Sequence, residues 1–276
     1  TNLDPSKVVA KHTDIEDAQQ TVSYPEIRTT LVSSENGTHE IQADKKLVLV
    51  DTIKYKNLKP NKEYTVSGVL YDKETGTPIK VNGKKVKSTT TFKPKKKNGT
   101  VDVTFTFDAT AIIGKDVVAF EKLFDVNGYL IAEHEDIDDE DQTVGIVDIH
   151  TTAVDGENNT HEMSLKDSAV LVDTVTYTNL TVGKKYDLHG TVIDKETGEK
   201  VAEATAAFTP DKRNGTAKVE FTINTNNLKG KTLVVFEQLF DGDKLIADHE
   251  DPNDETQTVT VPNSKIPERL IPKTGD

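Results

Sequence analysis

An internal repeat constrains the fold of this chain more than any single motif does. The segment DTIKYKNL at 51 returns as DTVTYTNL at 173, YDKETG at 71 as IDKETG at 193, and VVAFEKLF at 117 as LVVFEQLF at 233. The last pair is more closely spaced because the first copy carries an additional VNGKKVK loop. The 276 residues are enough for two such units with a core each. We predict the end of a preceding repeat at 1–22, full repeats at 23–145 and 146–261, and a spacer at 262–276.

The pattern within each repeat is that of β-strands. Residues 101–107, VDVTFTF, alternate apolar with polar side chains, and AKVEFTI at 217–223 does the same. Asn-Gly and Asp-Gly pairs separate such runs, and we expect them to close hairpins. They lie at 36–37, 98–99, 127–128, 155–156, 214–215 and 241–242. With no long amphipathic helix in view, the chain is predicted to be all-β, built from tandem immunoglobulin-like β-sandwich domains.

Composition excludes several classes of function. The 34 basic and 47 acidic residues give a net charge of -13, which repels nucleic acid and anionic membrane surfaces. The chain has no cysteine, so disulfides cannot brace it. No apolar run approaches the roughly 18 residues of a membrane helix, and the first residues lack the layout of a signal peptide. We expect no cofactor, no nucleic acid partner and a monomer.

One acidic phrase occurs three times. HTDIEDAQQTV begins at His12, HEDIDDEDQTV at His134 and HEDPNDETQTV at His249. The three copies share a histidine, an acid two residues on, an aspartate five residues on, and then Gln-Thr-Val. A single acidic loop is usually solvated surface, but three copies at fixed spacing indicate a role.

Two further repeated features accompany this phrase. A strand near the start of each repeat, PEIRTTLV or VDIHTTAV, has a pair of threonines, and strand parity turns Thr29 and Thr151 toward the core rather than Thr30 and Thr152. Glu121 lies in a run that is apolar on both faces, as does Glu237 in the second copy. Desolvation should raise the pKa of such a buried carboxyl group and keep it protonated.

Together these groups can perform acyl chemistry. A threonine hydroxyl becomes a nucleophile once a base accepts its proton, a histidine oriented by an aspartate is a suitable base, and a neutral acid can polarise a carbonyl group. The available carbonyl belongs to the glutamine of the acidic phrase. Attack by threonine on its carboxamide would release ammonia and leave an ester between the first and last strands of the domain. The site must exclude water to preserve that ester.

The Ile-x-Thr-Thr opening, DTVTYTNL, VVFEQLF and the closing His-x-Asp-x-x-Asp-x-x-Gln-Thr resemble the Thr-Gln ester-bond domains, or VaFE repeats, of Gram-positive surface adhesins. The resemblance implies an autocatalytic cross-link in each domain of a structural stalk, not a turnover enzyme. In the first repeat it implies a role for Thr29, Glu121, His134, Asp139 and Gln142, and in the second for Thr151, Glu237, His249, Asp254 and Gln257. The N-terminal remnant retains His12, Asp17 and Gln20 without a threonine or glutamate partner, so we expect it not to react.

The C-terminal residues suggest where the protein is located. Ile271, Pro272, Lys273, Thr274 and Gly275 resemble a sortase signal, Leu-Pro-x-Thr-Gly, after a proline-bearing spacer. Such a signal implies covalent attachment to cell-wall peptidoglycan and an extracellular, cell wall-anchored position. We expect a host ligand, if there is one, to bind an N-terminal domain that precedes this sequence.

Several alternatives stay open at this point. Asp136, Asp138 and Asp139 could bind calcium, although the loop lacks the glycine of an EF-hand and the second copy has Asn253 in place of Asp138. A ligand- or calcium-binding sandwich without a cross-link is therefore the second hypothesis, and a Thr or His–Asp hydrolase the third. Lysine–asparagine isopeptide bonds are disfavoured because the opening strands contain no lysine. The repeated Thr-His-Glu at His39 and His161 is interpreted as surface, and His150 as incidental.

Overall fold

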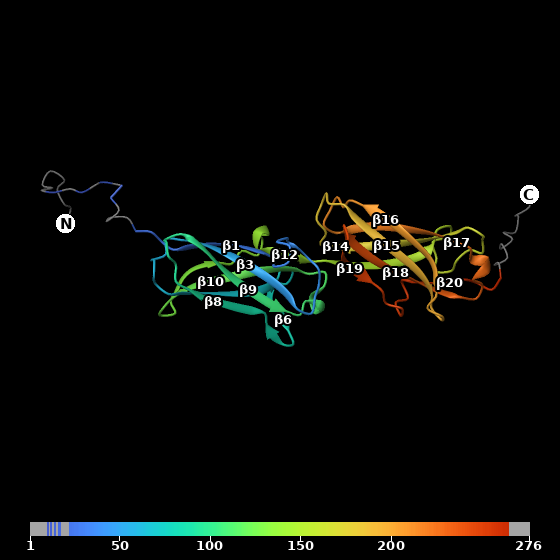
Figure 1. Cartoon of the computed structure of the whole chain (residues 1–276), viewed down its shortest axis with the longest axis horizontal. Helices are drawn as coiled ribbons and strands as arrows, with labels where there is room; N and C mark the ends of the chain where they lie inside the picture. Colours follow the sequence, from blue (N-terminus) through green and yellow to red (C-terminus); the bar gives the residue numbers. More distant parts are fainter. Residues whose placement is uncertain (1–9, 11, 13, 15, 18–21, 265–276) are drawn as a thin grey trace, which may run out of the picture.

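The chain forms two β-sandwiches arranged end to end, as the computed structural model shows (Figure 1). It describes residues 10, 12, 14, 16, 17 and 22–264. One core cluster runs from Ile27 to Ile146 and a second from Val147 to Val261, so the change of core falls between two consecutive residues. The all-β prediction is confirmed. In the described part of the chain no helix is long and apolar enough to cross a membrane.

The first sandwich packs a three-stranded sheet against a larger one. The smaller sheet has the order β1 (Glu26–Ser33), β3 (Leu47–Lys56), β9 (Gly99–Phe107). The larger sheet has the order β2 (Glu40–Ile41), β12 (Thr143–Ile146), β10 (Asp116–Asp125), β4 (Tyr64–Asp72), β5 (Thr77–Pro78), with β11 (Leu130–His134) beside β10 and β8 (Lys87–Phe92) beside β4. The short strands β6 (Lys80–Val81) and β7 (Lys84–Lys85) form a separate hairpin, and two 3-10 turns, η2 (Thr110–Ile112) and η3 (Glu140–Gln142), complete the unit.

The second sandwich repeats this plan. Its smaller sheet has the order β13 (Asp148–Asp155), β14 (Ala169–Thr178), β17 (Gly215–Ile223). Its larger sheet has the order β16 (Lys200–Phe208), β15 (Tyr186–Asp194), β18 (Thr232–Asp241), β19 (Lys244–His249), with β20 (Thr258–Thr260) beside β18 and the 3-10 turn η4 (Thr225–Asn227) before it.

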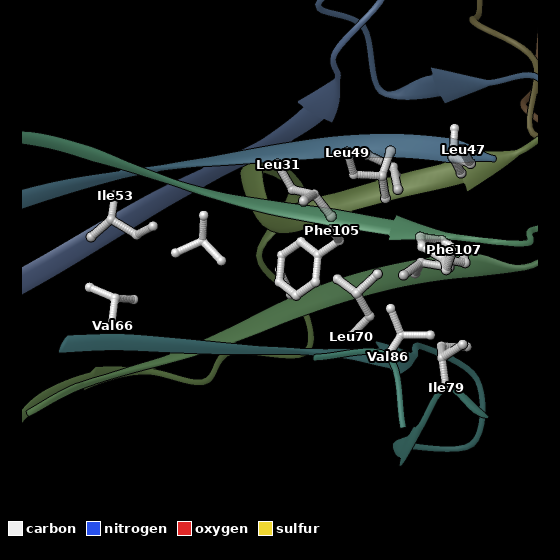
Figure 2. Packing of buried hydrophobic residues seen from close by; sticks show 14 of the residues in the cluster. Leu31, Leu47, Leu49, Ile53, Val66, Leu70, Ile79, Val86, Phe105 and Phe107 are labelled. Carbon is white, nitrogen blue, oxygen red and sulfur yellow. The ribbon is translucent and has the colours of Figure 1, made fainter. Parts of the chain in front are cut away.

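The alternating strands supply the core because every second side chain faces the opposite sheet. In β9, Val103, Phe105 and Phe107 are buried, and Figure 2 shows Phe105 among Leu31, Leu70 and other aliphatic side chains. The run around Glu121 is buried on both faces only from Val117 to Ala119, because Phe120 and Lys122 are half-buried. The prediction of a strand buried from both sides is therefore right only for residues 117–119 of β10, and Glu121 lies outside them.

The hairpin prediction was right at two of its six positions. Only the turns at 127–128 and 241–242 lie in short hairpins, β10–β11 and β18–β19, and Gly128 and Gly242 have φ angles of 82° and 59°. The pair 98–99 instead lies where the chain crosses from the larger sheet to the smaller one. Gly99 is needed there because a Cβ atom would lie 2.4 Å from the hydroxyl of Tyr55.

We predict that Gly68→Ala destabilises the first sandwich by about 1–3 kcal/mol, because overpacking forces side chains and backbone to move. A Cβ atom at Gly68 would lie 2.6 Å from Cζ of Phe105, a fully buried ring on the facing sheet. The urea midpoint of the first sandwich measures this loss. Ser67→Ala, whose side chain points to the other face of β4, is the control, and equal midpoints for the two variants would contradict the prediction.

Candidate cross-linking sites

The first site begins with Thr29 on β1. Its side chain faces the core between Ile27 and Leu31, and Thr29 is 4% exposed, whereas Thr30 is exposed. The alternation of β1 thus places one hydroxyl inside the sandwich and its neighbour in solvent. Across the core, Thr29 Oγ1 lies 3.2 Å from Oε2 of Glu121 on β10.

A second buried acid lies beside the first. Asp51 on β3 is fully buried, and neither of its carboxyl oxygens has a hydrogen-bond partner within the described residues. Burial raises the pKa of Asp51 to about 6. Burial, reinforced by the charge of Asp51, holds the pKa of Glu121 well above its usual range. At neutral pH, Glu121 is therefore the protonated member of the pair.

The glutamine enters this cluster from a 3-10 turn. Asp139 caps η3 by accepting a hydrogen bond from the backbone of Asp141 at 2.9 Å, and the turn ends at Gln142, which is fully buried. The glutamine thus lies just before the last strand, β12, rather than in it. The capping residue of η3 is the aspartate of the repeated phrase, so that residue also positions the glutamine.

The carboxamide of Gln142 is crowded by oxygen atoms. Its Nε2 lies 2.8 Å from the carbonyl of Ala119, 2.8 Å from Glu121 Oε2 and 2.7 Å from Thr29 Oγ1. An amide nitrogen carries only two hydrogens, so three oxygens cannot all accept from it. At 2.7 Å from Nε2, the threonine oxygen is in direct contact with the carboxamide group, whichever two oxygens accept its hydrogens.

A histidine completes the first site. His134, the last residue of β11, lies directly opposite Glu121 in the β10–β11 ladder. Its Nδ1 is 3.5 Å from Thr29 Oγ1, and its Nε2 is 3.2 Å from Asp139 Oδ2. Burial lowers the pKa of His134, against the opposing effect of Asp139, so the ring is neutral at neutral pH and can accept a proton. Hydroxyl, imidazole and carboxylate form a chain in that order.

The second sandwich assembles the same residue types with different contacts. Thr151 is 2% exposed, and its hydroxyl has no hydrogen-bond partner within the described residues. The backbone nitrogen of Thr151 donates to His249 Nδ1 at 3.1 Å, and His249 Nε2 is 3.2 Å from Asp254 Oδ2. Nε2 of Gln257 donates to the carbonyls of Val235 and His249, each at 2.8 Å. No hydrogen bond joins Thr151 to Gln257 in this part of the chain.

The second acid pair matches the first. Burial raises the pKa of Glu237 to about 9, with a contribution from the charge of Asp173. Burial likewise raises the pKa of Asp173 to about 6. Both residues are fully buried.

Sequence reasoning missed both aspartates of these pairs. Asp51 and Asp173 open the repeated segments DTIKYKNL and DTVTYTNL, in strands whose buried positions are otherwise apolar. An aspartate at a core-facing position of an alternating strand was the available signal.

His150, interpreted as incidental, lies against the second site. Its ring meets that of His249 edge to face at 5.2 Å, and its Nε2 pairs with Asp148 at 2.8 Å. Burial lowers the pKa of His249, and the neighbouring charge of His150 lowers it further. The equivalent residue in the first repeat, Arg28, acts on His134 in the same direction. The exposed position before the buried threonine therefore carries a basic side chain in both repeats.

One predicted contact was wrong. The sequence predicts that Glu121 polarises the glutamine carbonyl, but the carboxyl group of Glu121 faces the amide nitrogen, and Oε1 of Gln142 has no hydrogen-bond partner among the described residues. The reason is that Ala119 and Glu121 both offer acceptors to the amide nitrogen, which turns the carbonyl oxygen the other way.

The predicted residues near the two ends of the chain lie partly or wholly outside the residues that the structure describes. In the N-terminal segment, His12 Nε2 lies 3.2 Å from Asp17 Oδ2, the distance found for the other two His–Asp pairs. Gln20 and the sortase-like residues 271–275 lie outside the described residues. Within the described residues, no group of three or more His, Asp or Glu side chains is arranged to hold a metal ion.

The buried acids predict a dependence of stability on pH. A carboxyl group whose pKa is raised on folding favours the folded state when protonated, and this contribution is lost as the pH rises. In a Thr151→Ala chain, whose hydroxyl cannot react, the urea midpoint of the second sandwich should fall as the pH rises from 4.5 to about 9, the range over which Glu237 changes charge. Glu237→Gln in the same chain should flatten this fall. The exposed Glu255→Gln is the control, and an unchanged slope in Glu237→Gln would refute the assignment.

Comparisons with known proteins agree with this geometry at the level of the family. The family described as "T-Q ester bond containing domain" matches residues 1–24, 25–146 and 147–261. A search of curated proteins finds no match.

Solved structures give weaker similarities. A bacterial adhesin from Mobiluncus mulieris containing intramolecular disulfide, isopeptide and ester bond cross-links is 13% identical over 78% of this chain and 81% of its own, with a TM-score of 0.41. The C-terminal domain of the Streptococcus agalactiae AgI/II polypeptide BspA is 11% identical over 86% and 99%, with a TM-score of 0.38. A glycosyl hydrolase family 2 member from Bacteroides cellulosilyticus is 13% identical over 72% and 26%, with a TM-score of 0.31. Similarities this low do not assign a function. Because the family match spans nearly all of the sequence, the chain belongs to the T-Q ester bond containing domains.

Proposed function

We propose that each sandwich closes itself with an intramolecular ester, Thr29 to Gln142 and Thr151 to Gln257, and that the chain is a stalk segment of a bacterial cell-surface adhesin. The observation that carries the proposal is the contact of Thr29 Oγ1 with the Gln142 carboxamide, at 2.7 Å from Nε2, inside a water-excluding core. Holding a hydroxyl against a carboxamide in this way removes much of the entropic cost of bringing two reactants together.

The first step is attack by the hydroxyl. His134 Nδ1 accepts the proton of Thr29 as Oγ1 forms a bond to Cδ of Gln142. Asp139 stabilises the imidazolium that results, at 3.2 Å from Nε2. The lowered pKa of His134 suits this role because the ring is unprotonated before the reaction.

The second step is loss of ammonia. The bond between Cδ and Nε2 of Gln142 breaks, and the nitrogen takes up the proton that the hydroxyl lost, so that one ester and one ammonia replace one alcohol and one carboxamide. Glu121 is protonated and lies 2.8 Å from that nitrogen, so it can deliver the proton and recover one from His134. Each domain reacts once, which makes the chain a structural protein and not a turnover enzyme.

The second sandwich has the same set of groups. The hydroxyl of Thr151 lies on the core side of β13, and the Gln257 carboxamide is held by two backbone carbonyls. Rotation of the threonine side chain is the movement we expect before attack, since its backbone is already bonded to His249.

The benefit of the ester is mechanical. It joins a strand at the start of each domain to a residue just before its last strand, so a pulling force passes through a covalent bond instead of shearing the sheets. The first loop closes over 113 positions, for which chain entropy predicts a stabilisation of about 5 kcal/mol. Resistance to forced unfolding should exceed this figure because a bond must break.

The surroundings of the protein follow from the same proposal. A stalk needs an anchor, and the sortase-like residues 271–275 would join it to cell-wall peptidoglycan, placing the chain outside the cell. We propose that it acts there as a monomer and needs no cofactor, and that any host ligand binds to a domain further toward the N-terminus of the surface protein.

Intact mass tests the ester directly. The chain should be lighter than its sequence by two ammonia molecules, because each sandwich loses one. Thr29→Ala and Thr151→Ala should each restore one of them, whereas Thr30→Ala and Thr152→Ala should restore none. Hydroxylamine should cleave the link, since it opens esters but not amides. An unshifted mass together with stability that depends on calcium would favour the ligand-binding alternative.

His134→Ala should slow closure of the first sandwich by about 10²–10⁴-fold, the usual contribution of a general base. Purified variant protein should then contain an unclosed first sandwich and a closed second one. Mass spectra taken over time should show the slow loss of the ammonia that the first sandwich still retains. His189→Ala, which changes an exposed histidine of the second sandwich, is the control for closure of the first. Complete closure of His134→Ala at the earliest time would contradict the role given to this residue.

A further inference from the structure

The two sandwiches meet at a polar joint centred on Glu40. This residue belongs to the repeated Thr-His-Glu and lies in β2, at the end of the first sandwich. Its side chain is only 8% exposed because the second sandwich covers it. A carboxylate in this position requires donors from the neighbouring domain.

The second sandwich supplies four of them. The backbone nitrogen and the hydroxyl of Thr181 each donate to Glu40 Oε2 at 2.9 Å, and the hydroxyl of Tyr186 donates to the same oxygen. Lys184 Nζ lies 3.1 Å from Oε1. Burial and this carboxylate raise the pKa of Tyr186 to about 12, so the phenol remains a donor. We name Thr181, Lys184 and Tyr186 the socket.

Further contacts surround the socket. Nδ2 of Asn179 donates to the carbonyls of Gly114 and Ile146 at 3.2 and 3.1 Å, and Arg213 Nη2 lies 2.7 Å from Asp116 Oδ1. The backbones approach closely here. A Cβ atom at Gly145 would lie 2.6 Å from Arg213 Nη2 and 2.8 Å from Asn179 Cβ. Glycine is therefore required at the end of the first sandwich.

The linker alone would not fix the relative orientation of the two domains. Only Val147 separates β12 from β13, and a connection of this kind is by default a hinge unless the interface resists bending. The joint resists it through separate contacts. Glu40, Asp116 and Glu35 of the first sandwich pair with Lys184, Arg213 and Lys244 of the second. All three acid–base contacts restrain the relative orientation of the domains, and Glu40 is the most buried of the three acids, at 8% exposed against 28% for Asp116 and 71% for Glu35.

We propose that Glu40 locks the two sandwiches into one stiff unit, its carboxylate acting as the key to the socket of the following domain. Four donors on one buried carboxylate are directional and charge-assisted, so they hold only one arrangement of the domains. The proposal goes beyond the ester, which stiffens each sandwich internally and leaves their relative orientation free.

Part of the socket is repeated in the first sandwich, although Lys59 stands in the place of Thr181. In the first sandwich, Nδ2 of Asn57 donates to the carbonyl of Tyr24 at 2.9 Å, as Asn179 does to Ile146. The backbone nitrogen of Lys59 donates to the hydroxyl of Tyr64 at 3.0 Å, as that of Thr181 does to Tyr186. The surface that fits such a socket is the end of another domain of this family that carries the equivalent of Glu40, which we name the acidic corner.

The second sandwich carries a glutamate equivalent to Glu40. Glu162, in the second Thr-His-Glu, forms a β-bridge with Thr260, as Glu40 in β2 pairs with β12. Its carboxylate makes no hydrogen bond or ion pair within residues 22–264, so it provides a matched control for Glu40.

Distance measurements between the domains test the lock. The chain has no cysteine, so spin labels can be attached at Lys87→Cys on β8 and Thr205→Cys on β16, both exposed. Double electron–electron resonance should give one narrow distance distribution for the parent chain. Glu40→Ala should broaden it about twofold or more, as a free hinge would, and Glu162→Ala should leave it narrow. Tyr186→Phe, which removes one donor, should have a smaller effect than Glu40→Ala.

The outcomes are distinct. A Glu40→Ala distribution as narrow as that of the parent would overturn the proposal, and so would equal broadening in Glu162→Ala, since both sites cannot be the lock. Circular dichroism of each variant confirms that the sandwiches remain folded. The same samples should retain the loss of two ammonia molecules, so failure of the lock and failure of the ester are read separately.

Discussion

The structure depends on keeping a cluster of polar groups dry between two sheets. An alcohol, a carboxamide and two carboxyl groups in an apolar core would be unfavourable if the acids were charged, and burial therefore keeps Glu121 and Glu237 protonated. The sheets make room for the cluster by omitting side chains. A Cβ atom at Gly190 would lie 2.3 Å from Glu237 Oε1, so glycine at that position is part of the site.

The two copies of this cluster differ in the contacts that the threonine makes. In the first sandwich the threonine oxygen already touches the carboxamide, whereas in the second the backbone of Thr151 is bonded to the histidine and the hydroxyl has no partner in the described residues. The basic residue beside the histidine also differs, Arg28 in one copy and His150 in the other.

The protein is stabilised both within each sandwich and between the two sandwiches, and different bonds act at the two levels. Within a sandwich, the proposed ester joins residues 113 positions apart along the chain, so unfolding must break a covalent bond. Between sandwiches, the joint at Glu40 is non-covalent, and it holds orientation instead of preventing unfolding. A stalk that must both survive tension and project from a surface needs both properties. The repeat supplies them together, because the acidic corner and the socket belong to the same unit as the cross-linking groups.

Much of this protein could be predicted from its sequence. The repeat, the strand alternation and the three copies of the acidic phrase determined the all-β class, the tandem units and the residue types of the site, because periodicity two fixes which side chains share a face. What the sequence could not determine was decided by contacts between elements far apart in the chain. That Asp51 lies beside Glu121 depends on β3 pairing with β1 in the sheet that faces β10, and the crossing at Gly99 depends on which sheet each strand joins. The role of Glu40 depends on a neighbouring domain. Local pattern records which way a side chain points, and only the packed structure records what it meets there.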